Sequence, residues 1–185
     1  MPDEELARVV DGQMLSQELT TLSRIFQKPF ALKAMILNYN IPFLNAIFEK
    51  ALFVQLKRNH VCNIASVLGA RERQFGTREQ WYSFKIPEYP ELKDMDAVTQ
   101  AAGQVVHIDK AVTQGIGTIA QSRSLVVKYE EFCDDPRHIF MELLKKLGMD
   151  ESTVSYVGPR QFDVSHHVKT SERRAIEEAL SIFSP

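Results

Sequence analysis

The architecture of this chain follows from one segment, Ala51-Leu-Phe-Val-Gln-Leu-Lys-Arg58-Asn59-His-Val-Cys-Asn-Ile-Ala-Ser66. Residues 51–57 predict a buried strand, because their apolar side chains run together instead of alternating with polar ones. Asn59 can cap a helix that follows at once. Arg58 would then stand at the strand tip. The start of a helix offers free N–H groups and a positive dipole end, so this turn predicts an anion-binding site.

Arg58 and Ser66 are eight positions apart, which lets a strand tip and the second turn of a helix converge on one ligand group. Arginine offers a planar fork of donors that fits a phosphate, and serine adds a neutral donor. Spacing alone fits equally well a structural ion pair for Arg58 and a packing role for Ser66.

Two more apolar runs predict strands, Pro29–Ala34 and Ser124–Tyr129. Helices are expected over 3–26 with a possible break at Gly12, after Pro42, after Asn59, from 96 to 119, over 136–147 and after Thr170. Strands separated by helices favour an α/β fold with a parallel sheet covered on both faces. The ends of parallel strands meet at one edge, so Lys33 is expected to face the same crevice as Arg58, the alternative being a solvated charge.

The composition limits the possible functions. With 185 residues and 44% hydrophobic residues, the chain fits one domain, 1–185. A formal net charge of −2 argues against a nucleic-acid binder. Cys62 and Cys133 match no metal or redox motif, which favours a reducing, cytoplasmic location and predicts no metal. No apolar run reaches the roughly 20 residues of a membrane span, and the acidic start is no signal peptide.

Four groups of residues then carry a family resemblance. They are Leu32-Lys33 with Ile41-Pro-Phe-Leu44 and Phe48; Phe53 to Asn59 with Ser66; Glu79-Gln-Trp81-Tyr-Ser-Phe84 with Gln104-Val-Val-His107; and Val126-Val-Lys-Tyr129-Glu130 with Asp135-Pro136 and Leu147-Gly148. In this order and with these gaps, they resemble the sulfotransferases that use 3′-phosphoadenosine 5′-phosphosulfate (PAPS). The likeness is to the bacterial branch similar to tyrosylprotein sulfotransferases, over about residues 28–150.

The resemblance implies roles by position. Arg58 and Ser66 would bind the 3′-phosphate of PAPS, the co-substrate. Lys33 would offset charge on the bridging oxygen during transfer. Arg160 and Lys169 in the tail would reach the nucleotide phosphate. The acceptor would be a hydroxyl or amine on a small molecule or a peptide.

Two features of the sequence depart from the family. His60 stands where the family usually has proline. No strand, Gly- and Ser/Thr-containing loop and helix to cradle the 5′-phosphosulfate precede Lys33. The chain therefore resembles the C-terminal two-thirds of a P-loop NTPase-like sulfotransferase fold, N-terminally truncated. The open sheet edges would be covered by the N-terminal helix, by rearranged strands or by a second copy in a homodimer.

The remaining candidates have simpler explanations. His107 is expected to be a packing or surface histidine, and Arg71 a solvated residue at a helix end. Tyr129 and Glu130 are expected to orient the turn after the third strand. The alternative to an enzyme is a non-catalytic sulfotransferase-like remnant that binds a partner or self-associates. A nucleotide kinase ranks lower, because no phosphate loop and no Mg²⁺-binding carboxylate pair is evident.

Overall fold

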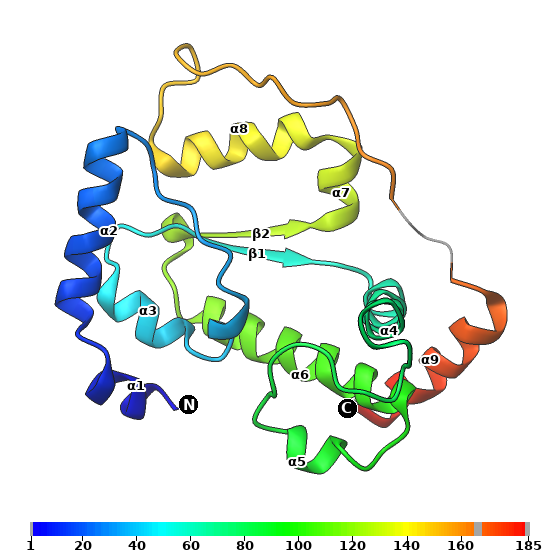
Figure 1. Cartoon of the computed structure of the whole chain (residues 1–185). Coiled ribbons are helices and arrows are strands. Elements are labelled where there is room, and N and C mark those ends of the chain that lie inside the picture. The colour runs from blue at the N-terminus through cyan, green and yellow to red at the C-terminus, as the bar shows by residue number, and fades with distance from the viewer. Residues whose placement is uncertain (1, 165–167, 184–185) are drawn as a thin grey trace.

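The computed structural model describes residues 2–164 and 168–183 (Figure 1). The described elements are α1 (Asp3–Val9), α2 (Gly12–Phe26), η1 (Met35–Leu37), α3 (Ile41–Ile47), β1 (Phe53–Lys57), α4 (His60–Phe75), α5 (Tyr89–Leu92), α6 (Ala97–Gly117), η2 (Gln121–Arg123), β2 (Ser124–Lys128), α7 (Tyr129–Asp134), α8 (Pro136–Leu147) and α9 (Thr170–Phe183).

The two strands form a parallel pair in which Lys57 lies opposite Lys128. Both strands therefore end at the same edge. There β1 leads into α4 and β2 leads into α7 (Figure 1). The strands expected over residues 51–57 and 124–129 are confirmed, and so is the α/β class.

The strand expected at Pro29–Ala34 is wrong. Residues 28–34 form an extended coil that pairs with neither β1 nor β2, and Lys33 is exposed on it. Pro29 has no N–H to donate, and a third strand gains little unless a helix or another sheet covers its apolar side chains. Phe30 and Leu32 accordingly stay in contact with solvent.

Each strand is covered by a helix on one side only. Figure 1 shows α6 along β1 and α8 along β2, on opposite sides of the sheet. Buried Gln55 of β1 donates hydrogen bonds to Asp109 and Thr113 of α6, at 3.3 and 3.0 Å. Val54 and Leu56, on the other face of β1, are 48% and 59% exposed. Helices therefore lie on both faces of the sheet, as expected, but each face keeps exposed apolar residues, namely Val54 and Leu56 on one and Val126 on the other.

The main core lies where α4, α6 and α9 pack together. Ile64 and Leu68 of α4, Ala101 and Ala102 of α6 and Ile176 of α9 are all fully buried. The small residues of α6 let its neighbours approach closely. A Cβ on Gly103 would lie only 2.5 Å from Leu92 of α5.

The expected helix boundaries follow from side-chain caps. Asn59 Oδ1 accepts from the backbone N–H of Cys62 at 3.2 Å, and Asp135 Oδ1 accepts from that of His138 at 3.0 Å. Gly148 ends α8 in the left-handed conformation, with a φ of 64°. The N-terminal helical region is two helices rather than one, because Asp11 caps a new start and accepts from Met14 N–H at 2.9 Å.

Arg71 contradicts the expectation of a solvated helix end, because its side chain is fully buried. Nη1 donates to the carbonyl of Arg78 at 3.2 Å and to Oε1 of Gln100 at 3.0 Å. The guanidinium carbon lies 5.4 Å from the centre of the Trp81 ring. Burial lowers the pKa of Arg71, and the charge of Glu79 opposes that shift. Arg71 thus fastens the segment after α4 to α6.

Loss of this anchor should destabilise the fold. Arg71→Ala removes two hydrogen bonds to a charged group and leaves Gln100 Oε1 buried without that donor. We expect the free energy of unfolding to fall by about 2–4 kcal/mol, measured by urea denaturation followed by circular dichroism. The matched control is Arg73→Ala, two positions along the same helix and exposed, which should change it by less than about 0.5 kcal/mol. If the two substitutions lowered the free energy of unfolding equally, the anchoring role of Arg71 would be wrong.

Candidate functional site

A cavity of about 450 Å³ lies where the two strands end. Ligands of open α/β sheets bind at this edge, beyond the carboxyl ends of the strands. The described lining residues are Lys57, Arg58, Asn59, Cys62, Lys128, Glu130 and Arg173. Among them are four basic side chains and one carboxylate, so the cavity favours an anion.

Arg58 is held in place by the ring of Tyr129. Its guanidinium carbon lies 4.8 Å from the ring centre, a distance typical of a cation–π contact. A hydrogen bond with Cys133 is the main cause of a raised pKa for the Tyr129 phenol, which is neutral near pH 7 even at the ordinary tyrosine pKa of about 10. The ring thus presents a neutral face that orients the Arg58 guanidinium without drawing away its charge.

Glu130 ties the two strand ends together. Its Oε1 accepts from the backbone N–H of Asn59 at 3.1 Å, across the gap between the turn after β1 and the helix after β2. These contacts of Tyr129 and Glu130 agree with the role in orienting the turn that the sequence suggested. His60 begins α4 directly after the Asn59 cap, so the turn forms without the family's proline.

Asp109 of α6 balances the positive charge from one side. Its carboxylate lies 3.6 Å from Lys57 Nζ and 3.4 Å from His60 Nε2. The ion pair with Lys57 is partly exposed, which makes its contribution to stability small. Its consequence is positional, because it fixes the strand tip against α6.

Arg173 of α9 lines the cavity, and the sequence analysis did not find it. Its Nη1 lies 3.7 Å from Glu177 one turn later. The tail residues expected to reach the phosphate, Arg160 and Lys169, are exposed and do not line the cavity. No local signal marks Arg173, since it reaches the cavity only because buried Ile176 packs α9 on the core.

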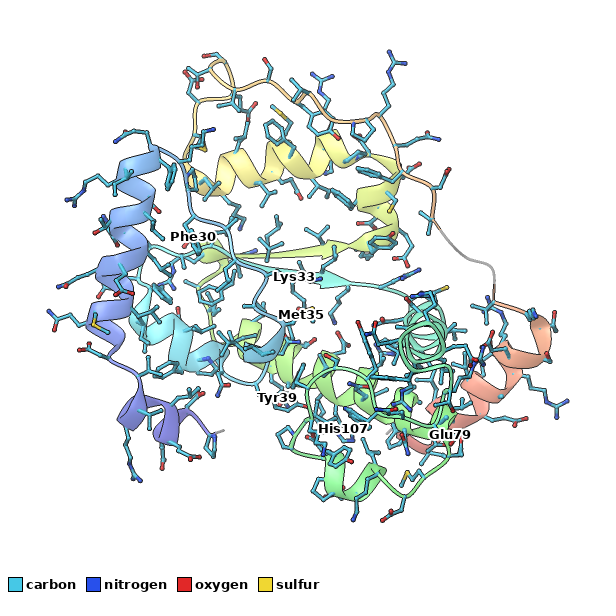
Figure 2. The ribbon with its side chains drawn as sticks, in the orientation of Figure 1. Phe30, Lys33, Met35, Tyr39, Glu79 and His107 are labelled. Carbon is cyan, nitrogen blue, oxygen red and sulfur yellow. The ribbon has the colours of Figure 1, made fainter. Side chains whose placement is uncertain are left out.

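Ser66 and Lys33 also lie outside the lining residues of the cavity. Ser66 is exposed and sits one turn beyond Cys62 on the same side of α4. Lys33 is exposed on the coil before η1, as Figure 2 shows. The structure therefore brings Arg58, Lys57 and Lys128 together, and the roles of Ser66 and Lys33 stay predictions.

A second cavity, of about 660 Å³, lies beside α6. Its described lining residues are Asn38, Tyr39, Pro42, Pro87, Glu88, His107, Lys110, Ala111, Gln114, Gly115 and Thr118. Tyr39 Oη donates to Glu88 Oε2 at 2.9 Å, and His107 Nδ1 lies 3.6 Å from Glu88 Oε1. Burial, followed by the hydrogen bond to Glu88, raises the pKa of Tyr39. Figure 2 shows Tyr39 just before α3 and His107 on α6. His107 thus lines the cavity beside the Glu88 carboxylate, and its expected role as a packing or surface histidine stays a prediction.

Within residues 2–164 and 168–183, no three His, Cys, Asp or Glu side chains are grouped so as to hold a metal ion. None of the helices in these ranges is both long and apolar enough to cross a membrane.

Comparison with models of protein families gives a match to the sulfotransferase family over residues 3–153. Comparisons with curated proteins and with solved structures gave no match. The matched region begins well before residue 28, where the resemblance was expected to start, and it ends before most of the tail. It contains both strands, the turn at Arg58 and the helix that carries His107. Because this match covers most of the chain, the chain belongs to the sulfotransferase family, whose enzymes transfer a sulfuryl group.

Proposed function

We propose that this protein transfers a sulfuryl group from PAPS to a hydroxyl or amine of a small molecule or peptide, and that the first cavity holds the 3′-phosphate of the nucleotide. The observation that carries the proposal is the group of cations where β1 and β2 end, next to the start of α4. The proposed donor, PAPS, is a polyanion. The positive charge of the first cavity suits the end of PAPS that carries the 3′-phosphate.

The contacts of Arg58 support this assignment. Tyr129 orients the guanidinium before any ligand arrives, so little side-chain freedom is lost on binding. Lys57 and Lys128 add charge from both strands, and the positive end of the α4 dipole adds to it. A phosphate group, with three terminal oxygens, can accept from several of these donors at once.

Transfer itself needs positioning and charge stabilisation more than covalent chemistry by the protein, by analogy with phosphoryl transfer. The acceptor oxygen or nitrogen attacks sulfur, and negative charge grows on the oxygen that bridges sulfur to the nucleotide phosphate. We propose that Lys33 offsets this charge. Its position on an exposed coil leaves the ammonium free to approach a bound nucleotide.

The phosphate assignment predicts that Arg58→Ala weakens binding of 3′-phosphoadenosine 5′-phosphate, measured by isothermal titration calorimetry. Loss of charge-assisted hydrogen bonds worth about 1.5–3 kcal/mol corresponds to roughly 10- to 150-fold weaker binding. Arg173→Ala should weaken it less, since Arg173 also faces Glu177. Exposed Arg137 of α8 lies outside both cavities, so Arg137→Ala is the matched control.

If Arg58→Ala and the wild type bound 3′-phosphoadenosine 5′-phosphate with equal affinity, the assignment of the phosphate site to this cavity would be wrong. The same series tests the tail. If Arg160→Ala and Lys169→Ala lowered the affinity while Arg173→Ala did not, the tail residues rather than α9 would contact the nucleotide. Radiolabelled sulfate transfer by the wild type separates the enzyme from a non-catalytic binding protein.

We further propose that a second copy of the chain covers the open face of β1. Val54 and Leu56 are about half exposed there, and β1 has one edge without a paired strand in the described sheet. Such edges and apolar faces are usually covered in native proteins.

Self-association through β1 predicts that Leu56→Lys yields a smaller species in sedimentation velocity, because an ammonium group would be buried in the contact. Val126→Lys is the control. Val126 is also about half exposed, but it lies on the opposite face of the sheet, as its pairing with Gln55 shows. A wild-type protein that sediments as a monomer would rule out the homodimer.

A cytoplasmic location is also part of the proposal. Cys62 and Cys133 are buried free thiols, and reduced cysteines are usual in that compartment.

A further inference from the structure

We propose that the second cavity binds the acceptor of the transfer reaction, and that His107, held by Glu88, takes the proton from the acceptor hydroxyl or amine. This inference rests on the proposed sulfuryl transfer. It assigns a function to this cavity and the role of a base to His107, which was expected from the sequence to be a packing or surface histidine.

The cavity is built from three segments that are distant in sequence. Glu88 comes from the segment between α4 and α6, Tyr39 from the connection before α3, and His107 from α6. One oxygen of Glu88 accepts from Tyr39 at 2.9 Å, and the other lies 3.6 Å from Nδ1 of His107. The carboxylate is thus held between a phenol and an imidazole, and both His107 and Glu88 remain about a quarter exposed at the cavity.

The orientation of His107 suits a general base. With Nδ1 facing a carboxylate, Nε2 is the nitrogen that can accept a proton, and the carboxylate stabilises the imidazolium that forms. The ring also packs edge-on against Phe183, 5.8 Å away, which limits its rotation. Lys110, one turn further along α6, is the other charged group in the lining.

The step balances without a further reagent. The acceptor O–H or N–H attacks sulfur while its proton passes to His107 Nε2. The bond between sulfur and the bridging oxygen breaks, and its electron pair leaves with the nucleotide phosphate. The products are the sulfated acceptor, 3′-phosphoadenosine 5′-phosphate and one proton, which His107 later releases to water.

Helix α6 places this cavity near the proposed donor site. His107 and Asp109 are two residues apart on α6, so their side chains point about 160° apart around the helix axis, and Asp109 faces Lys57 of the first cavity. His107 of the second cavity and Lys57 of the first therefore lie on opposite sides of α6, a helix about 10–12 Å in diameter. Lys33 precedes Asn38, a lining residue of the second cavity, by five positions, a span of at most about 18 Å.

The lining indicates a small and polar acceptor. Glu88 and Lys110 carry opposite charges, and Asn38, Gln114 and Thr118 add neutral hydrogen-bonding groups. Besides Tyr39 and His107, two prolines, Ala111 and Gly115 complete the wall. We therefore use tyramine as the probe, because it offers both a phenolic hydroxyl and an amine.

The binding part of the proposal is tested without nucleotide, by NMR titration of the imidazole C–H signals with tyramine. His107 is assigned from its missing signal in His107→Gln. We expect the His107 signal to shift and the signal of His138, which is exposed on α8, to stay in place. Glu88→Gln should weaken tyramine binding at least tenfold. A His107 signal that does not move, or that moves equally in Glu88→Gln, would overturn the acceptor site.

The catalytic part is tested by transfer of radiolabelled sulfate from PAPS to tyramine. His107→Gln should lower kcat by 100-fold or more, with KM changed less than threefold. His138→Gln is the matched control and should match the wild type. Unchanged kcat in His107→Gln, or no transfer to bound tyramine by a wild type that binds 3′-phosphoadenosine 5′-phosphate, would overturn the proposal.

Calorimetry with 3′-phosphoadenosine 5′-phosphate separates the two hypotheses. His107→Gln should bind this nucleotide as the wild type does, since His107 does not line the first cavity. A wild type that does not bind the nucleotide refutes the donor site, whereas the NMR titration still decides the second cavity by itself.

Discussion

The parallel pairing of β1 with β2, in the register that sets Lys57 opposite Lys128, is the constraint on which the rest of the structure depends. Parallel strands need a long crossover, and here α4 and α6 supply it. Both strands then end at one edge, where their lysines and Arg58 gather. Like charges this close repel one another, and Asp109, Glu130 and the ring of Tyr129 offset that cost. The residual positive charge attracts an anion.

Helix α6 lines the second cavity and, through Asp109, contacts Lys57 at the first. Asp109 and Thr113 of α6 accept hydrogen bonds from Gln55 of β1, and these bonds fix the helix to the strand. The buried alanines and Gly103 of α6 let α4, α5 and α9 close around it. A helix packed on so many sides has little freedom to shift. For that reason a residue on one of its sides and a residue on the other keep a constant separation, which a two-substrate reaction requires.

The features that depend only on neighbouring residues along the chain could be predicted from the sequence. The two strands follow from their apolar runs, and Asn59 and Asp135 cap helices because a side-chain oxygen reaches an N–H three residues on. Prediction from the sequence failed where distant contacts decide. Pro29–Ala34 has strand composition but no partner strand, and Arg71 has a surface residue type but a buried place beside Trp81. Arg173 and Glu88 reach their cavities from segments whose packing no local pattern encodes.

The position of Glu88 shows how the buried arginine and the second cavity are connected. Glu88 lies in the middle of the segment between α4 and α6, and that segment is fastened near both of its ends. Arg71 binds the carbonyl of Arg78 at one end, and Gln100 binds the carbonyls of Lys93 and Met95 at the other, at 3.0 and 2.8 Å. Because Arg71 also donates to Gln100, a single buried polar cluster holds both ends. A carboxylate that must face Tyr39 and His107 together needs such anchoring, since a mobile loop would lose orientation entropy each time the pair formed. The buried guanidinium of Arg71 thus helps to hold the segment that carries Glu88.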